Sequence, residues 1–162
     1  MKRIPVLFLA GLLLLAACDQ KGKVPKSQSD FVMRLKRAQD TVTLFQHQKE
    51  LQTRIITNMG KYVANNMNFT DWAFKVERIN GETVDLKVPA PTDTTGYNVR
   101  FAMLVPEGDA KLQGQVSKLK VGDLIKADGE LAMKTADGKI SMNEYFQSDS
   151  AKFIKIIPKQ LK

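Results

Sequence analysis

The chain contains one cysteine, Cys18, and its surroundings indicate a specific chemistry for the thiol. It follows 14 apolar residues, 4–17, which follow the two cations Lys2 and Arg3. As a helix this stretch would span roughly 21 Å, which is too short for a hydrocarbon core about 30 Å thick. A basic start, a short apolar middle and small residues at the exit are typical of a secretory signal peptide. We therefore expect residues 1–17 to be removed.

The sequence Leu15-Ala16-Ala17-Cys18 resembles the lipobox of bacterial lipoproteins. The resemblance implies that the Cys18 thiol receives a diacylglycerol, that the chain is cut just before it, and that the new amine is acylated. Two or more acyl chains hold a protein firmly on a bilayer. The resemblance thus implies a Gram-negative envelope protein facing the periplasm, and Asp19 resembles the signal for retention in the inner membrane, with the outer membrane as the alternative. An alternative for Cys18 itself is a small buried side chain in an ordinary helix.

Charge and residue content narrow the classes of function. Loss of residues 1–17 would leave 145 residues, enough for one domain, and would lower the formal charge from +8 to +6. A basic balance suits anionic headgroups or nucleic acid, and is also common on surfaces that bind neither. With Cys18 acylated and His47 as the sole histidine, we expect no metal site and no cofactor. His47 has no evident acid–base partner and the serines lack a nucleophile elbow, so we do not expect an enzyme.

The mature chain begins with a polar segment and continues with a helical pattern. Residues 18–29 carry glycine, proline and three lysines without apolar periodicity, and predict a flexible tether. Residues 30–66 predict one amphipathic helix, about 55 Å long if continuous. Its apolar track follows a 4-3 spacing with a polar break at its middle. The track consists of Phe31, Leu35, Ala38, Val42, Phe45, Lys49, Gln52, Ile56, Met59 and Val63.

The first half of this track predicts a partner-binding seam formed by Phe31, Leu35, Val42 and Phe45. Such a seam would pair with a second copy of the chain or with an envelope protein partner. A second apolar track widens the stripe in the later half, which we expect to pack on the following domain. The alternative is that the whole helix docks on its own domain.

From Trp72 the apolar period changes to two, which is typical of strands with one buried face. Asn80-Gly81 predicts a tight hairpin between the first two of these strands. The pattern predicts a short helix around residues 112–119 and a final extension that Pro158 ends. The strands are expected at residues 72–79, 83–88, 99–105, 124–133 and 139–146, with the extension at 152–157.

This order of elements, together with LKVGDLIKADGEL at residues 119–131, resembles the oligonucleotide/oligosaccharide-binding (OB) fold. The resemblance covers residues 71–158, where Gly129 would allow the bend at a barrel corner. It implies an α+β protein with an N-terminal long helix followed by a small five-stranded OB-fold-like β-barrel. Small envelope lipoproteins of this barrel class are similar, so we expect a non-catalytic interaction or assembly module.

The alternative function is single-stranded nucleic-acid binding, for example in a DNA-transfer or secretion system. OB barrels bind single strands by stacking bases on exposed aromatic rings and by following the phosphates with a basic groove. Four cations occupy outward-facing strand positions: Lys75, Lys87, Arg100 and Lys126. The strand aromatics share parity with core residues, and acidic residues interrupt the basic face. We therefore expect little affinity for nucleic acid.

Overall fold

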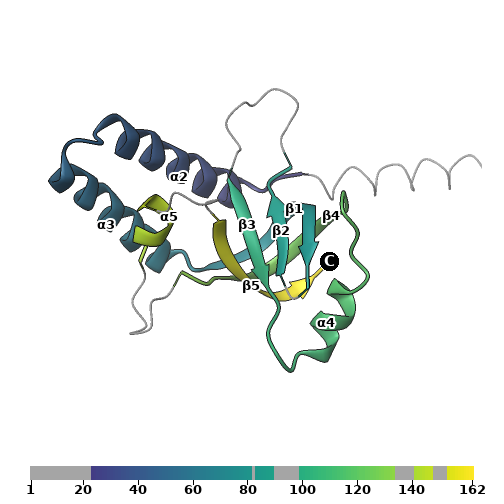
Figure 1. Cartoon of the computed structure of the whole chain (residues 1–162). Coiled ribbons are helices and arrows are strands. Elements are labelled where there is room, and N and C mark those ends of the chain that lie inside the picture. The colour runs from purple at the N-terminus through teal and green to yellow at the C-terminus, as the bar shows by residue number, and fades with distance from the viewer. Residues whose placement is uncertain (1–22, 82, 90–98, 134–140, 148–152) are drawn as a thin grey trace, which may run out of the picture.

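In a computed structural model of the chain, two helices lie side by side against a closed five-stranded β-barrel (Figure 1). The structure describes residues 23–81, 83–89, 99–133, 141–147 and 153–162. The expected signal peptide at 1–17, Cys18 and Asp19 lie outside the described residues. The elements are α2 (Lys26–Leu44), α3 (Lys49–Asn65), β1 (Asn68–Asn80), β2 (Thr83–Lys87), β3 (Arg100–Leu104), α4 (Ala110–Val116), β4 (Leu124–Leu131), α5 (Asn143–Gln147) and β5 (Phe153–Leu161).

The helical region is a hairpin of two helices, so the prediction of one long N-terminal helix over residues 30–66 is wrong. The chain reverses where the apolar track has its polar break. Lys49 is exposed at the start of α3, and the side-chain amide of Gln52 donates a 3.2 Å hydrogen bond to the Val42 carbonyl of α2. Burying these polar groups in one continuous seam would remove their hydration. The hairpin begins at Lys26, within the segment expected as a tether.

The first turns of α2 dock on the barrel through a ring cluster. Phe31 and Leu35 are 1% and 0% exposed. The Phe31 ring centroid lies 5.2 Å from that of Trp72 and 6.4 Å from that of Phe101, both of which belong to barrel strands. Aromatic rings at these separations add attraction beyond the burial of their area. The helix therefore completes the barrel core at this end.

A polar contact fixes where α2 sits along β1. The pairing between β1 and β2 ends at Lys75 and Lys87. If the pairing continued, Ala73 would lie opposite Pro89, which has no N–H to donate. The Gln28 amide fills this position: it donates to the Ala73 carbonyl at 2.7 Å and accepts from the Ala73 N–H at 2.8 Å. Gln28 is fully buried, so both backbone groups are satisfied without water.

The barrel closes in the strand order β1-β2-β3-β5-β4, with β4 pairing back to β1. Every pair is antiparallel except β3 with β5, which is parallel. Trp72, Phe74 and Val76 are all buried, as the period-two pattern predicts. The predicted α+β class and the small five-stranded barrel are thus confirmed. Helix α4 follows β3 in sequence and packs against β5 (Figure 1).

The last strand lies later in the chain than the pattern predicts. Residues 143–147, which overlap the end of the expected strand 139–146, form the short helix α5, so that strand prediction is wrong there. Met142, Tyr145 and Phe146 are buried together, because spacings of three and four residues place side chains on one helical face. The sequence also predicts a turn at residues 136–138, between the strands expected at 124–133 and 139–146, and this turn lies outside the described residues.

Strand β5 runs from Phe153 to Leu161, so the prediction that the final extension ends at Pro158 is wrong. Pro158 faces Gly129, next to a register shift between Asp128 and Gly129. Proline is tolerated beside such an irregularity because the ladder there does not require its missing N–H. A Cβ atom on Gly129 would lie 2.8 Å from Cζ of Phe69 and 3.1 Å from Cα of Pro158, and would clash with the Ile157 carbonyl oxygen. Only glycine lets β4 and β5 approach this closely.

Candidate interaction surfaces

The seam predicted to bind a partner is largely used inside the molecule. Phe31 and Leu35 face the barrel and are almost fully buried. Val42 and Phe45 lie at the C-terminal end of α2, and both are partly exposed. Val42 packs against the core from its edge. The half of the seam nearest the barrel is therefore covered by this chain's own strands.

The hairpin carries a groove between α2 and α3, with a volume of about 630 Å³. From α2 the groove is lined by Met33, Arg34 and Arg37, and from α3 by Ile55 and Tyr62 among others. Met33 is 45% exposed, which is high for a side chain of its size and hydrophobicity. The groove thus presents apolar surface on a face that no strand of the described chain covers.

Two guanidinium groups flank this apolar surface. The Arg34 guanidinium carbon lies 4.2 Å above the centroid of the Tyr62 ring, a cation–π contact that holds the side chain along the groove. Lys36 pairs with Asp40 at 3.0 Å, whereas neither Arg34 nor Arg37 pairs with any carboxylate of the described residues. Asp30 also lines the groove. The lining therefore holds two cations and one anion.

The hairpin as a whole is basic. Residues 26–65 contain seven lysines and arginines against three acidic residues, which gives a formal charge of +4. This segment therefore carries half of the +8 of the full chain. A field of this sign attracts anionic partners before contact is made.

Three of the four cations proposed for nucleic-acid binding form a continuous row on the outer face of the barrel. Lys75 of β1 faces Lys87 of β2, Lys87 faces Arg100 of β3, and Arg100 faces Phe153 of β5. Residues directly opposite in a sheet share a face, so the row ends in an aromatic ring. Lys126 of β4 is not part of this row and lies opposite Ala73 of β1.

A carboxylate already occupies the middle of this row. Glu77 pairs with Lys87 at 2.9 Å and with Arg100 at 3.6 Å. On the same sheet Arg78 pairs with Asp85 at 2.7 Å, and Asp85 is only 6% exposed. These pairs lower the positive potential that a phosphate backbone would meet.

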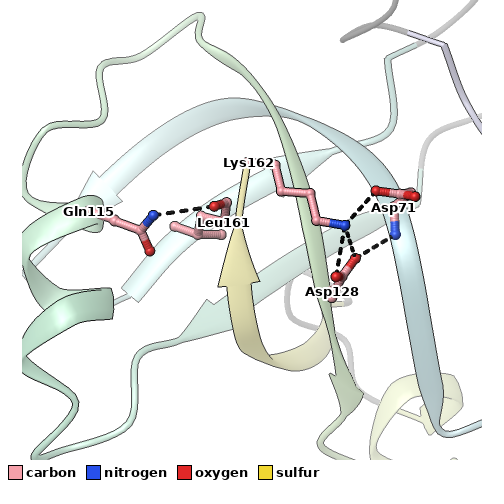
Figure 2. A network of polar contacts seen from close by, with 5 residues as sticks. All are labelled: Asp71, Gln115, Asp128, Leu161 and Lys162. Atoms are coloured by element: carbon pink, nitrogen blue, oxygen red, sulfur yellow. Dashed lines mark hydrogen bonds and ion pairs between the residues drawn. The ribbon is translucent and has the colours of Figure 1, made fainter.

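A network of polar contacts joins β1, β4 and the end of β5 (Figure 2). The Lys162 amine lies 2.7 Å from a carboxylate oxygen of Asp71 and 2.8 Å from one of Asp128. Asp128 also accepts the Asp71 N–H at 2.7 Å, which stabilises Asp71 in its left-handed conformation at φ 55°. The hydrogen bond from Lys162 holds the pKa of Asp128 below its ordinary value, and the same bond raises the pKa of Lys162.

The second contact in Figure 2 attaches helix α4 to the barrel. The side-chain amide of Gln115 donates a 3.2 Å hydrogen bond to the Leu161 carbonyl of β5. The two contacts lie on either side of the β5 end (Figure 2). We assign this region to barrel closure, since each charged or polar group in it faces another group of the same chain.

Residues with catalytic potential do not gather in the described part of the chain. His47 lies at the hairpin turn, where a ring nitrogen is 3.2 Å from the Gln46 amide. Ser141 Oγ accepts a hydrogen bond from the Asn143 N–H at 3.3 Å. Across the described ranges no three His, Cys, Asp or Glu residues are placed to hold a metal ion together. None of the described helices combines the length and hydropathy needed to cross a bilayer.

The groove is the surface that sequence reasoning missed. Its signal is a second helical face: Met33 and Arg37 are four residues apart, and Ile55, Asn58 and Tyr62 are three and four apart. These two sets meet only because α2 and α3 are antiparallel. No family model, curated protein or solved structure matches this chain.

Proposed function

We propose that the protein is a lipid-anchored lipoprotein of the Gram-negative envelope that serves as a non-catalytic interaction module. Acylation of Cys18 after cleavage would attach it to the periplasmic face of a membrane, with Asp19 favouring the inner one. Helix α2 begins at Lys26, eight residues after Cys18, and an extended chain of that length reaches about 28 Å. The folded body would therefore stay close to the bilayer, where an envelope partner can meet it.

We further propose that the barrel is an OB fold. The strand order, the parallel pairing of β3 with β5, and a helix between β3 and β4 all support this assignment. The connection between β1 and β2 is the short turn at Asn80-Gly81. The connection from β4 to β5 spans residues 132–152 and contains α5.

The observation that best supports an interaction module is that the helical hairpin buries one face on the barrel and leaves a groove on another. One side is buried on the barrel through Phe31 and Leu35. Another side holds the groove, with Met33 exposed and two arginines without a carboxylate partner among the described residues. A groove between two helices is a common binding site for a partner segment. The module would thus hold its partner on the hairpin and keep the barrel as its rigid base.

Anchoring is tested by fractionating envelopes that contain the wild-type chain or the Cys18→Ala variant. We expect the wild type in the membrane fraction with an acylated Cys18 at its N-terminus, identified by mass spectrometry of the intact protein. The Cys18→Ala variant should lack the lipid. A mature wild-type protein with a free thiol and residues 1–17 still attached would reject the anchor.

The binding surface is tested by photocrosslinking from single positions of the full-length protein in cells. A photoreactive residue at Met33 or at Asn58, on opposite walls of the groove, should give the same crosslinked product. The matched control is Gln113 on α4, which is exposed and far from the groove in sequence and fold. Equal crosslinking from Gln113, or none from either wall, would reject the groove as the binding surface.

The row Lys75–Lys87–Arg100 supports single-stranded nucleic-acid binding as a second candidate. The adjoining Phe153 could stack on a base, as aromatic rings do in OB domains. Against it stands Glu77, which pairs with two of the three cations. We therefore rank this function below the interaction module.

A further inference from the structure

We propose that the groove between α2 and α3 binds an amphipathic helix that carries carboxylates beside its apolar stripe. This inference names the partner class and rests on the proposed function as an interaction module. The partner helix would lie along the hairpin as a third helix. Three features of the groove support it: its shape, its apolar lining and its two arginines.

The shape favours a helix. The two helices that form the walls run side by side for most of their length (Figure 1), so the groove of about 630 Å³ follows their common direction. Ridges of side chains from a third helix pack into such a groove at spacings of three and four residues. Partner helices of this kind anchor with apolar residues at i, i+3 or i+4, and i+7.

The apolar lining offers contacts for those anchors. Met33 contributes from α2, while Ile55 and Tyr62 contribute from α3. Methionine adapts its shape to different partner side chains and is frequent at surfaces that bind helices. Covering the 45% of Met33 that is now exposed would add apolar burial that the described chain does not provide.

The arginines specify the charge of the partner. Arg34 and Arg37 lie three residues apart on α2, and therefore on neighbouring positions of one helical face. Carboxylates three or four residues apart on a partner helix would match this spacing, and each could form a two-pronged pair with a guanidinium. Arg34 is already held along the groove by its contact with Tyr62, so less freedom is lost on binding.

Charge also argues against other occupants. A second copy of the hairpin would bring its own +4 against the same face, and like charges facing each other disfavour association. A bilayer surface is flat and would not reach the apolar lining between the helices. An acidic amphipathic helix satisfies both the cations and the concave apolar surface.

The test uses full-length lipidated protein in a nonionic detergent and a fluorescent synthetic peptide of about four helical turns. The probe peptide carries leucines at i, i+3, i+4 and i+7 with flanking glutamates, and the matched peptide carries lysines instead of the glutamates. We expect the glutamate peptide to bind at least about tenfold more tightly, with an affinity that falls as salt rises. Equal affinity for both peptides would overturn the inference.

Variants locate the site. The double variant Arg34→Gln/Arg37→Gln should weaken binding of the glutamate peptide about tenfold, and Met33→Ala should weaken binding of both peptides. Arg37→Gln alone keeps the Arg34–Tyr62 contact, so it guards against a folding defect, and circular dichroism checks each variant. The control Lys111→Gln/Lys118→Gln removes two exposed cations from around α4 and should leave binding unchanged.

Two further outcomes would also overturn the inference. One is binding to anionic phosphatidylglycerol vesicles or single-stranded DNA that requires Arg34 and Arg37 while the glutamate peptide does not bind. The other is peptide binding that the groove variants leave unchanged. Crosslinking from Met33 and Asn58 in cells without any affinity for the glutamate peptide would reject this partner class and leave the proposed function standing.

Discussion

The side-chain amide of Gln28 forms a two-bond pair with the backbone of Ala73, at 2.7 and 2.8 Å. Through this pair helix α2 supplies β1 with hydrogen bonds where β2 no longer does. The nearby Trp72 indole N–H donates to Ser27 Oγ at 3.3 Å. The start of the hairpin is thus attached to the barrel by polar contacts of defined geometry in addition to ring packing.

Replacing this amide should loosen the whole hairpin. We expect Gln28→Ala to lower the free energy of unfolding by about 2–4 kcal/mol, since two buried backbone groups of Ala73 would lose their partners. Urea denaturation of the full-length chain measures the loss, and Gln113→Ala on the exposed face of α4 is the control. A loss no larger than that of the control would mean that water replaces the amide in solution.

Gly129 and Gly114 offer a matched pair of glycine substitutions. Gly129→Ala should destabilise the protein by about 1–3 kcal/mol, because the added carbon would meet β5 backbone and the Phe69 ring. Gly114→Ala adds its carbon in open space within α4 and should stabilise by about 0.5–1 kcal/mol. Thermal unfolding followed by circular dichroism compares both. Equal effects of the two changes would contradict the close approach of β4 and β5.

Local sequence patterns predict most of the barrel strands, because the alternation of buried and exposed positions lies within each strand itself. The alternation Trp72-Phe74-Val76 identifies a buried face regardless of what covers it, and Asn80-Gly81 allows only a narrow choice of turn. The short run at residues 142–146 was ambiguous, because a few apolar residues fit a strand or one helical turn equally well. In the folded protein a helical turn is formed, because it buries Met142, Tyr145 and Phe146 together.

The helical hairpin and its groove could not be predicted in the same way. The spacing of Phe31 and Leu35 reports an apolar face, and that face is the same whether a second chain or the protein's own barrel covers it. The groove depends on Arg37 and Ile55 lying on adjacent helices, which follows only once the chain reverses after α2. The alternation of outward positions predicts Lys75, Lys87 and Arg100 on one face. The structure was needed to show that Glu77 pairs with Lys87 and Arg100.

The contact between Asp128 and Lys162 makes stability depend on acid pH. The pKa of Asp128 is lowered in the folded protein, so its contribution is present above the ordinary value of 3.8 and is lost as the pH falls through the lowered value. Asp128→Asn should lower stability at neutral pH and flatten its decline below about pH 4. Urea midpoints across that range provide the measurement. Parallel pH curves for the two proteins would contradict this role.

Tyr145 makes stability depend on alkaline pH. Burial raises the pKa of its phenol from 10.0 to about 12, so the neutral form stabilises the fold fully below pH 10 and this contribution is lost as the pH rises toward 12. Ultraviolet titration of tyrosinate should show one late component that Tyr145→Phe removes. If Tyr145→Phe instead removes amplitude near pH 10 and leaves the late part of the curve unchanged, the ring is accessible to solvent.

Glu77 decides whether the cation row on the barrel can hold a nucleic-acid strand. In the wild type its single negative charge is shared between Lys87 and Arg100 and lowers the net charge of the row, so fluorescence anisotropy should detect little binding of single-stranded DNA at physiological salt. Glu77→Gln leaves both cations without this partner and should raise the affinity several-fold at low salt, with a steeper salt dependence. Lys75→Gln in that background should reverse part of the gain, whereas Lys118→Gln should not. Micromolar binding by the wild type that Lys75→Gln weakens would instead make nucleic acid the first candidate ligand.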